Sequence, residues 1–588
     1  MSRYILGISA QFHDAAAALV CDGNVVAAAA EERFSRIKHD AAFPRRAAKW
    51  CLESHNLRPD DLEYVVFHEK PLWKFERLII TQLQHFPRSF GAFRRTALGW
   101  LTDKLWIRNT IANELGVDTR KIIFCNHHLS HAASAFYTSD FTTAAVLTVD
   151  GVGEWASTAL FAASEKGLER LEEIRFPHSI GLVYSAFTAY LGFEVNDGEA
   201  KVMGLASYGQ PRFRDEIRRI LRGRQDGSFD VDLSYVTYHY SAIESYSRKL
   251  ETLLGPARKP DAPLDMQTAE GRRLADIAAS IQAVTEDCLV DLANALHKRT
   301  GARDLCFAGG VALNSVANYH LLKRTPFQRI FVHPAAGDDG CAVGAALWAW
   351  NEVLRAPRGA ALCNAGLGKS WSDGDIAKVL DDLGVKHDEL DDDQLVDRAT
   401  ADLTHGKALG WFQGRFEWGP RALGYRSILA DARHAGMNDH INRKIKFREE
   451  FRPFAPAVSA GSEDRYFDLP PGSGLITPWM LLVVPVLPYG AEMLPATTHV
   501  DRTARPQVVA ETANPLFHRL LSNFGAATGH PVLLNTSFNL KGEPIVASPL
   551  HALRTFFSSD LDVLYLGRFR VLNTDADKRN QRWPSRAA

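Results

Sequence analysis

Two histidines one helical turn apart form the pattern in this sequence with the clearest chemical meaning. His127-His128-Leu129-Ser130-His131 is followed by small apolar residues, which predicts that the segment begins a helix. Residues four apart share a helical face, so His127 and His131 can hold one metal ion together. His128 points elsewhere and is expected to be a bystander or to support the pair. A pair of ordinary core histidines is the alternative.

Carboxylates in two later turns can complete such a site. Asp150 ends an apolar run and precedes Gly151-Val152-Gly153, which suits both metal ligation and close approach of a phosphate. Asp338 lies in a Gly-Asp-Asp-Gly turn, where plain turn chemistry is the competing interpretation. Imidazole and carboxylate ligands without thiolate favour Fe(II), Mn(II), Co(II) or Zn(II) in an open site.

Three loops after predicted strands suggest a nucleotide site beside these ligands. They span residues 7–14, 150–153 and 308–314, and in the last of them Gly310 admits a close ligand while Asn314 can bond a ribose or base. None is a Walker A or Rossmann fingerprint, so each loop alone is a weak signal. Their order along the chain is similar to that in the actin, sugar-kinase and heat-shock ATPase superfold.

Arginine-containing turns in the last third of the chain predict an anion site. The expected ligands are Arg421 in GRFEWGPRALGYRS, Arg452 in KFREEFRPFAP, Arg505 in TARPQ, and Asn535 and Ser537 in NTSFN. Planar guanidinium groups joined by amide and hydroxyl donors suit a phosphate or carboxylate dianion. Surface salt bridges are the alternative, but they would leave the Gly-Pro-Arg and Asn-Thr-Ser-Phe-Asn turns unexplained.

The elements that must position these residues have the pattern of an α/β protein. Strands are predicted at residues 4–9, 16–21, 25–29, 144–149, 159–162, 304–307 and 329–332. The aromatic and basic stretch 73–109 predicts an inserted helical hairpin packed on the core, with a membrane-surface or partner helix as the alternative. The polar residues 206–275 suggest a substrate-facing insertion. No internal sequence repeat is apparent.

Length and composition define the broad class of protein. The 588 residues predict two domains, 1–355 and 374–588, joined by a linker at 356–373. Lys and Arg number 68 and Asp and Glu 69, which argues against a nucleic-acid partner. Seven scattered cysteines without a Cys-x-x-Cys pair indicate neither a disulfide framework nor a zinc ribbon. With no signal peptide or membrane-spanning stretch in the sequence, the cytoplasm is the expected location.

The histidine and aspartate pattern resembles the universal tRNA-threonylcarbamoyl transferase family. In that family, two histidines and two aspartates bind a metal that contacts the nucleotide phosphate. The residues that match this pattern are His127, His131, Asp150 and Asp338. Asp197 and Gly209, which flank the segment KVMGL, resemble more loosely that family's nucleotide-side loop.

The chain as a whole resembles the O-carbamoyltransferase family of nodulation-factor and antibiotic-tailoring enzymes. The opening GISAQFHDAAAA and the segment from EERF to KHD also fit that family, while Val152 departs from some of its members. The resemblance implies an actin-like N-terminal domain that binds metal and nucleotide, and a C-terminal YrdC-like α/β domain.

The same resemblance implies a mechanism in two half-reactions. Carbamoyl phosphate and ATP, with Mg(II) as a possible companion of ATP, yield carbamoyl adenylate and pyrophosphate by way of carbamate in the arginine domain. The carbamoyl group then passes to an acceptor hydroxyl beside the metal bound by the histidines and aspartates. The resemblance indicates that this metal is Fe(II). Lys38 is expected to neutralise phosphate charge. His13 or Asp14 is expected to position the acceptor or take its proton, although His13 can also be a structural loop residue.

The expected partner is a small-molecule or saccharide acceptor, with a homodimer as a possibility. A tRNA-threonylcarbamoyl-type transferase is less favoured, because its two domain types are usually separate chains and this chain has no basic excess. A hydrogenase-maturation carbamoyltransferase should carry zinc-finger cysteine pairs, and none is present. A non-catalytic ATP-binding regulator would leave the arginine domain without a role.

Overall fold

The computed structural model describes residues 2–573 except 103, 225, 261 and 450, and these residues form two compact units. The first unit comprises the chain up to residue 28, residues 41–362 and residues 470–475. The second comprises residues 29–40, residues 363–469 and the chain from 476 onward. The main division therefore falls inside the predicted linker, but the predicted domains 1–355 and 374–588 did not include the two exchanged segments.

Side-chain hydrogen bonds explain why residues 29–40 pack with the second unit. Arg33 Nη2 donates to the Gly419 carbonyl at 2.9 Å, and the guanidinium of Arg36 donates to the carbonyls of Pro544 and Ile545, both at 2.7 Å. These partners lie several hundred residues away along the chain. Sequence patterns that report local structure cannot reveal such a pairing.

The first unit contains a repeated sheet topology. In the described part of the chain its two five-stranded sheets have the orders β3-β2-β1-β4-β5 and β8-β7-β6-β11-β12. In the first sheet, the central strand β1 pairs antiparallel with β2 and parallel with β4. In the second sheet, β6 likewise pairs antiparallel with β7 and parallel with β11. The strands are β1 (Tyr4–Ser9), β2 (Ala16–Cys21), β3 (Asn24–Ala30), β4 (Leu62–Phe67), β5 (Ile122–Phe124), β6 (Ala144–Val149), β7 (Ala156–Ser164), β8 (Gly167–Arg175), β11 (Asp304–Ala308) and β12 (Arg329–Val332).

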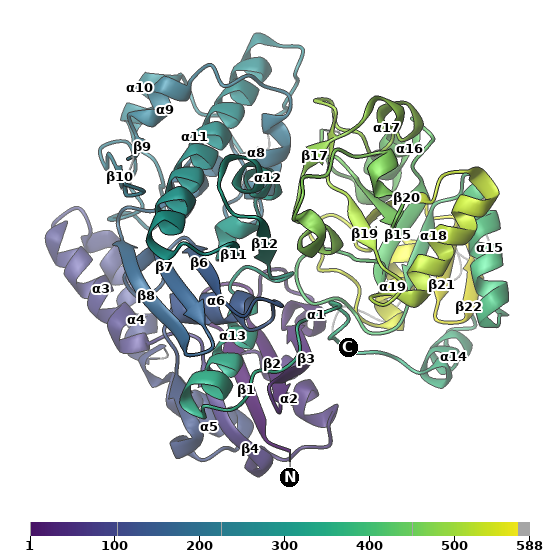
Figure 1. Ribbon diagram of the computed structural model, residues 1–588, viewed down its shortest axis with the longest axis horizontal. Coiled ribbons are helices and arrows are strands. Elements are labelled where there is room, and N and C mark those ends of the chain that lie inside the picture. The colour runs from purple at the N-terminus through teal and green to yellow at the C-terminus, as the bar shows by residue number, and fades with distance from the viewer. Residues whose placement is uncertain (1, 103, 225, 261, 450, 574–588) are drawn as a thin grey trace. The chain divides into compact units, whose positions relative to one another are not determined.

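This duplication confirms the predicted α/β class and the actin-like arrangement of the N-terminal part. All seven predicted strands are present, most within one or two residues of their predicted ends. The repeat was not visible in the sequence because the halves share a topology rather than residues. The larger helices of the unit are α2 (Arg45–Glu53), α6 (His127–Phe136), α7 (Ile180–Tyr190), α8 (Glu199–Ala206), α11 (Ala269–Thr300), α12 (Ser315–Arg324) and α13 (Gly340–Trp348) (Figure 1).

Helices α6 and α13, which follow the last strand of each half, pack closely against each other. A Cβ atom added at Gly344 of α13 would lie 1.7 Å from the Ser130 carbonyl oxygen of α6, so only glycine permits this approach. We expect Gly344→Ala to lower the free energy of unfolding by about 3 kcal/mol, because one helix must move. Thermal unfolding measures this effect. Gly374→Ala is the matched control, since Gly374 is exposed on a helix and has open space around it.

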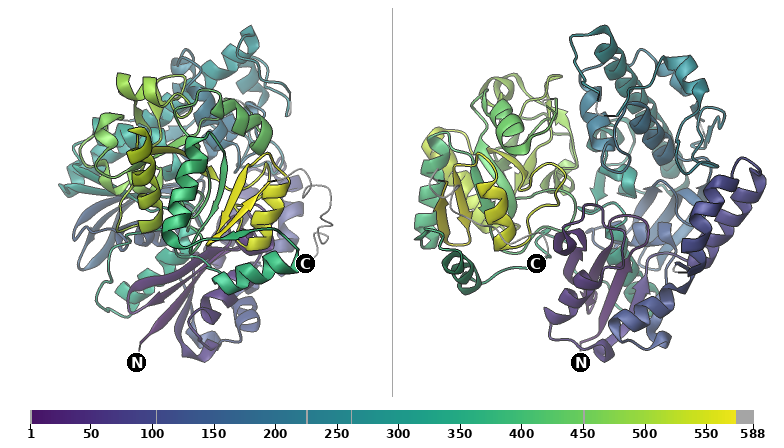
Figure 2. Two further views of the ribbon diagram at one scale, coloured as in Figure 1. Left: turned by 90° about the vertical axis from the view of Figure 1, so that its right-hand side faces the viewer. Right: turned by 180° about the vertical axis from the view of Figure 1, so that it is seen from behind.

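The aromatic and basic stretch folds as predicted, as a helical hairpin. It contains α3 (Pro71–Gln84) and α4 (Phe90–Thr102), and α5 (Ile107–Leu115) follows. The hairpin lies at the periphery of the first unit in both face views (Figures 1 and 2). Before the start of α11, the described residues of the predicted insertion at 206–275 form short elements, namely α9 (Arg214–Arg218), β9 (Leu221–Gly223), β10 (Phe229–Val231) and α10 (Arg248–Leu254). That it faces substrate stays a prediction.

The second unit is built on a mixed sheet. Among the described residues it has eight strands in the order β13-β22-β21-β14-β15-β20-β16-β19. These are β13 (Asp388–Glu389), β14 (Leu409–Phe412), β15 (Arg426–Asp431), β16 (Ala455–Ser459), β19 (Gln507–Val509), β20 (Val532–Ser537), β21 (Val563–Leu566) and β22 (Phe569–Leu572). A buried apolar cluster joins this sheet to α15 (Asp392–Thr404) and α18 (Pro515–Thr528). The α/β character is confirmed, and the YrdC-like assignment stays a prediction.

The remaining elements of the second unit are short. Its other helices are α1 (Glu32–Ser35), α14 (Asp373–Asp382), α16 (Met437–His440), α17 (Pro488–Met493) and α19 (Pro549–Phe557), and β17 (Val484–Pro485) pairs with β18 (Thr503–Ala504). Across the described residues, no helix combines the length and apolarity needed to cross a bilayer.

Candidate functional site

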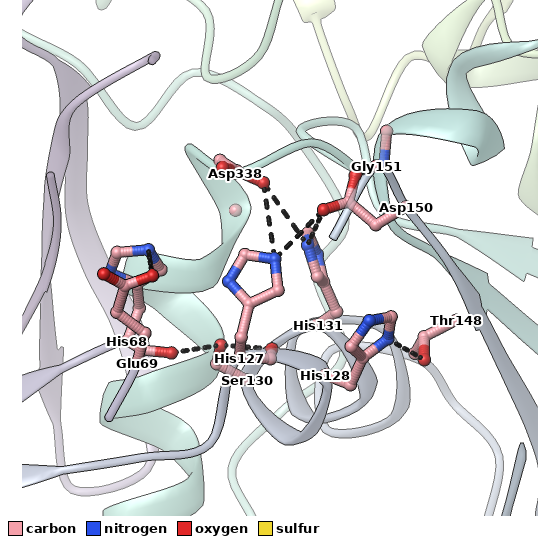
Figure 3. A network of polar contacts seen from close by, with 12 residues as sticks. His68, Glu69, His127, His128, Ser130, His131, Thr148, Asp150, Gly151 and Asp338 are labelled. Carbon is pink, nitrogen blue, oxygen red and sulfur yellow. Dashed lines mark hydrogen bonds and ion pairs between the residues drawn. The ribbon is translucent and has the colours of Figure 1, made fainter. Parts of the chain in front are cut away.

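The predicted histidine pair lies on the first turns of α6, as its spacing required. Asn126 caps the helix by accepting a hydrogen bond from Leu129 N. His127 and His131 are buried and direct their Nε2 atoms to the same point (Figure 3). His128 turns away, with Nδ1 2.8 Å from Thr148 Oγ1.

Two carboxylates meet the imidazoles at that point. His127 Nε2 lies 3.0 Å from Asp150 Oδ2 and 3.7 Å from Asp338 Oδ1. His131 Nε2 lies 3.8 Å and 3.5 Å from the same two oxygens. Ligands of a tetrahedral metal with bonds of about 2.1 Å are separated by about 3.4 Å. The four imidazole–carboxylate separations thus lie near those of a coordination shell.

Their burial and charge also fit a divalent cation. Among the described residues, His131 Nε2 and Asp338 Oδ1 are buried without a hydrogen-bond partner. Burial opposes charge on His131, yet the neighbouring Cys341 and the two carboxylates raise its pKa well above the usual value. Burial likewise disfavours ionised Asp150, but the two imidazoles hold its pKa well below the usual value. Protons on the imidazoles therefore compensate the negative charge of the two carboxylates. A bound divalent cation can supply the same positive charge.

The glycine loops position this cluster. Gly310 N donates to Asp150 Oδ1 at 3.0 Å and so orients the carboxylate. A Cβ at Gly153 would lie 2.9 Å from the His127 ring, so glycine is needed for the close approach of the two segments. Gly151 accepts a hydrogen bond from Ser179 Oγ through its carbonyl at 2.7 Å. Within the first unit, these contacts give the loops a structural role, and their predicted contact with nucleotide stays a prediction.

Glu154, which the sequence analysis did not assign, fixes the start of α6. Its carboxylate accepts hydrogen bonds from Lys70 N at 2.9 Å, Asn126 Nδ2 at 2.8 Å and His127 N at 3.0 Å. We expect Glu154→Gln to lower metal affinity by about 10-fold, because groups that orient metal ligands have effects of that size. Titration of the metal-free protein with a divalent metal measures this affinity. Glu169→Gln, on exposed β8, should leave the affinity unchanged.

Cys341 is a second residue that sequence reasoning missed. Its buried thiol lies close enough to His127, His131 and Asp338 to be counted with them as a possible ligand group. Burial raises the pKa of the thiol to about 11. The only signal in the sequence was its place directly after the acidic turn that contains Asp338.

His13 reaches the edge of the cluster. Its Nε2 lies 3.8 Å from Asp338 Oδ2, and its Nδ1 lies 2.9 Å from Asp14 Oδ2. Burial opposes its charge, but Asp338 and Asp14 prevail and raise the pKa of His13 to about 9. The two predicted catalytic residues of this loop are thus beside the predicted metal ligands.

The remaining predicted nucleotide residues have local partners. Asn314 caps α12 through Ala317 N and exchanges two side-chain hydrogen bonds with Gln282, each 3.0 Å long. Asp197 pairs with Lys201, Nζ to Oδ2, at 3.4 Å. A Cβ at Gly209 would lie 2.1 Å from the Ala275 carbonyl oxygen, so this glycine lets the turn pack on α11. These residues lie in one unit, but their contacts are structural.

The predicted arginines gather in the second unit. In the described part of the chain, the side chains of Arg421, Arg452 and Arg505 make no hydrogen bond or ion pair. Burial and the charge of Arg452 lower the pKa of Arg421 to about 10. Burial and the charges of Arg421, Arg448 and Arg452 lower the pKa of Arg505 strongly. Among the described residues these cations face one another rather than carboxylates, which favours the predicted anion site over surface salt bridges.

Asn535 and Ser537, the predicted amide and hydroxyl ligands, have hydrogen-bond partners in the same unit. Asn535 Nδ2 donates to Gln507 Oε1 at 2.8 Å, and Asn535 Oδ1 has no partner among the described residues. Lys446, which the sequence analysis did not select, donates to Ser537 O at 2.6 Å and to Asn539 Oδ1 at 2.6 Å. Burial lowers the pKa of Lys446 strongly, with Arg448, Arg452 and Lys38 adding to the effect.

Lys38 therefore has a defined place in the second unit. It belongs to the exchanged segment 29–40, and its charge acts on Lys446. Its predicted function beside the metal stays a prediction. Its position adds another cation to the arginine cluster.

The described residues thus form two clusters: buried imidazole and carboxylate groups that could hold a divalent cation, and arginines that face one another. The chain matches the carbamoyltransferase N-terminus over residues 4–347 and the carbamoyltransferase C-terminus over residues 400–573. It belongs to the carbamoyltransferase family.

Relatives from several bacteria agree with this assignment. The chain is 43% identical to an uncharacterized protein of Synechocystis over 98% of both chains. It is 38% identical to the nodulation protein NolNO of Sinorhizobium fredii over 95% of this chain and 79% of that protein. It is 34% identical to the 3'-hydroxymethylcephem-O-carbamoyltransferase of Amycolatopsis lactamdurans over 41% of this chain and 44% of that enzyme.

Proposed function

We propose that this carbamoyltransferase uses ATP and carbamoyl phosphate to carbamoylate a hydroxyl group of a small-molecule or saccharide acceptor. The observation that carries the proposal is the presence, in one chain of this family, of two separate clusters with complementary chemistry. One offers imidazole and carboxylate ligands, and the other offers cations without counter-ions.

The first half-reaction fits the second unit. Water cleaves carbamoyl phosphate to carbamate and inorganic phosphate, and the carbamate oxygen then attacks the α-phosphate of ATP, releasing pyrophosphate and forming carbamoyl adenylate. Every species in these two steps except water is anionic, so Arg421, Arg452 and Arg505 would bind the anions and stabilise developing charge. The amide of Asn535 would orient them, with its free Oδ1 accepting a hydrogen bond from the carbamoyl nitrogen.

The second half-reaction fits the first unit. The acceptor oxygen attacks the carbamoyl carbon, the bond to the phosphate oxygen breaks, and AMP leaves. His127, His131, Asp150 and Asp338 would hold a divalent metal, for which Fe(II) is our proposal, and which when bound stabilises negative charge on phosphate oxygens. His13 would take the acceptor proton. Compensation of the charge of Asp338, the largest of the contributions that raise the pKa of His13, would bring that pKa down and favour this role.

Two assays test this function with the full chain. We expect labelled pyrophosphate to exchange into ATP only when carbamoyl phosphate is present, and labelled carbamoyl phosphate to label a hydroxyl acceptor. Exchange without carbamoyl phosphate, or none with it, would contradict the proposal. A non-catalytic regulator would give neither signal, and a tRNA-type transferase would label tRNA rather than a saccharide.

A further inference from the structure

The α3–α4 hairpin exposes an apolar end that the proposed reaction does not use. Leu83 near the end of α3 is 71% exposed, Phe86 in the connection between the helices is 68% exposed, and Phe90 at the start of α4 is 55% exposed. We call residues 83–95 the hairpin tip. Large apolar side chains this exposed and this close together indicate a surface that meets another apolar phase.

The hairpin tip is a fixed structure. Ser89 Oγ donates to the Gln82 carbonyl at 2.6 Å and closes the turn between the helices. The Phe86 and Phe90 rings meet edge to face with centroids 6.5 Å apart. The hairpin root is anchored separately, by the buried ion pair of Lys74 Nζ with Glu69 Oε2 at 2.5 Å. Phe86 and Phe90 are therefore exposed on a turn that has its own internal contacts.

The charge around these aromatic rings has one sign. Arg88, Arg94 and Arg95 are exposed at the tip, and within the described residues none of them forms an ion pair. The sequence from residue 77 to residue 102 contains no Asp or Glu. An overall charge of -1 for the chain makes this local basic surface distinctive.

These features select one occupant. A second copy of this chain docked tip to tip would bring six like charges together with no carboxylate between them, which is unfavourable. A bilayer containing anionic lipid offers both an apolar phase for the rings and phosphate groups for the arginines. We propose that the hairpin tip docks on an anionic membrane surface, with Leu83, Phe86 and Phe90 entering the interface. This inference does not depend on the proposed chemistry.

Vesicle flotation with the full chain tests the proposal. We expect binding to vesicles of phosphatidylcholine with phosphatidylglycerol and little binding to phosphatidylcholine alone. The triple change Arg88→Gln, Arg94→Gln, Arg95→Gln should lower the partition coefficient about 100-fold, since each basic residue near an anionic surface contributes about 5-fold. The double change Phe86→Ser, Phe90→Ser should lower it by a similar factor.

Matched controls separate docking from general stickiness. Ile243→Ser removes an equally exposed apolar residue, 71% exposed, from a loop of the same unit and should leave binding unchanged. Binding that survives the phenylalanine changes, or that is absent from anionic vesicles at low salt, would overturn the proposal. So would a dimer in solution that the phenylalanine changes dissociate, because the tip would then be an interface between copies. Pyrophosphate exchange should be unchanged in all these variants. The vesicle assay therefore tests membrane docking, the exchange assay tests the proposed carbamoyl transfer, and either proposal can fail without the other.

Discussion

Replacing His131 with alanine is expected to remove the bound metal and abolish carbamoyl transfer while leaving carbamoyl-phosphate-dependent pyrophosphate exchange measurable. His131 is fully buried, and its Nε2 atom has no hydrogen-bond partner among the described residues. Loss of one of four protein ligands should weaken metal binding by at least about 100-fold, more than the loss of a group that only orients a ligand. Metal analysis after dialysis and the two activity assays check this result.

The same change should destabilise the first unit. Without His131, the buried carboxylates of Asp150 and Asp338 lose a compensating charge, which we expect to lower the free energy of unfolding by about 3 kcal/mol. A chelator should lower the melting temperature of the wild-type protein and have little effect on His131→Ala. His405→Ala, at an exposed position, is the control. Full transfer activity with unchanged metal content in His131→Ala would contradict the two-site proposal.

The sequence allowed the close approach of the two histidines and two aspartates to be predicted because local rules place each of them, and their role as metal ligands stays a prediction. The four-residue spacing of His127 and His131 puts both on one helical face, and Asp150 and Asp338 each follow a buried strand of the same sheet. Parallel strands bring their carboxyl ends to one edge, so residues far apart in the chain come together. The strand pattern was readable for the same reason, since buried strands have a strong apolar signal.

Residues that act through long-range contacts could not be predicted in this way. Glu154 was visible only as the end of a glycine turn, although it binds the start of a helix formed almost 30 residues earlier. The exchange of residues 29–40 depends on arginines that reach carbonyl groups several hundred residues away. Asn314 has contacts that the sequence did not reveal. Its side chain caps a helix and pairs with Gln282, while its predicted contact with a ribose or base stays a prediction.

The arginine motif shows why residue type alone does not identify a ligand. Arg415, Arg421 and Arg426 lie within twelve residues of sequence. Arg415 donates to the carbonyls of Leu367 and Gly368, and Arg426 donates to those of Gln413 and Gly414. Of these three side chains, only that of Arg421 makes no hydrogen bond or ion pair with the described residues. Two of the three guanidinium groups therefore support the fold, and Arg421 is the one that we propose binds substrate.

This difference leads to opposite expected effects for two neighbouring arginines. Arg421→Ala should reduce pyrophosphate exchange by at least about 100-fold, because a charge-assisted, bidentate contact is lost. It should also raise the free energy of unfolding by about 1 kcal/mol, because one charge is removed from a group of cations that repel one another. Inorganic phosphate should stabilise the wild-type protein more than this variant. Thermal unfolding with and without phosphate measures both differences.

Arg426→Ala should instead destabilise the second unit by about 3 kcal/mol. The carbonyls of Gln413 and Gly414 would lose their hydrogen-bond donor. Phe412 would lose its contact with the guanidinium group, which lies 3.6 Å from the centre of its ring. Any loss of exchange in this variant should follow the loss of folded protein and be restored at a lower temperature. In Arg421→Ala the loss should persist at every temperature at which the protein is folded. If Arg421→Ala destabilised the unit and retained exchange, the cluster would be a structural element rather than a substrate site. The sign of the stability change therefore separates the two roles before any acceptor is identified.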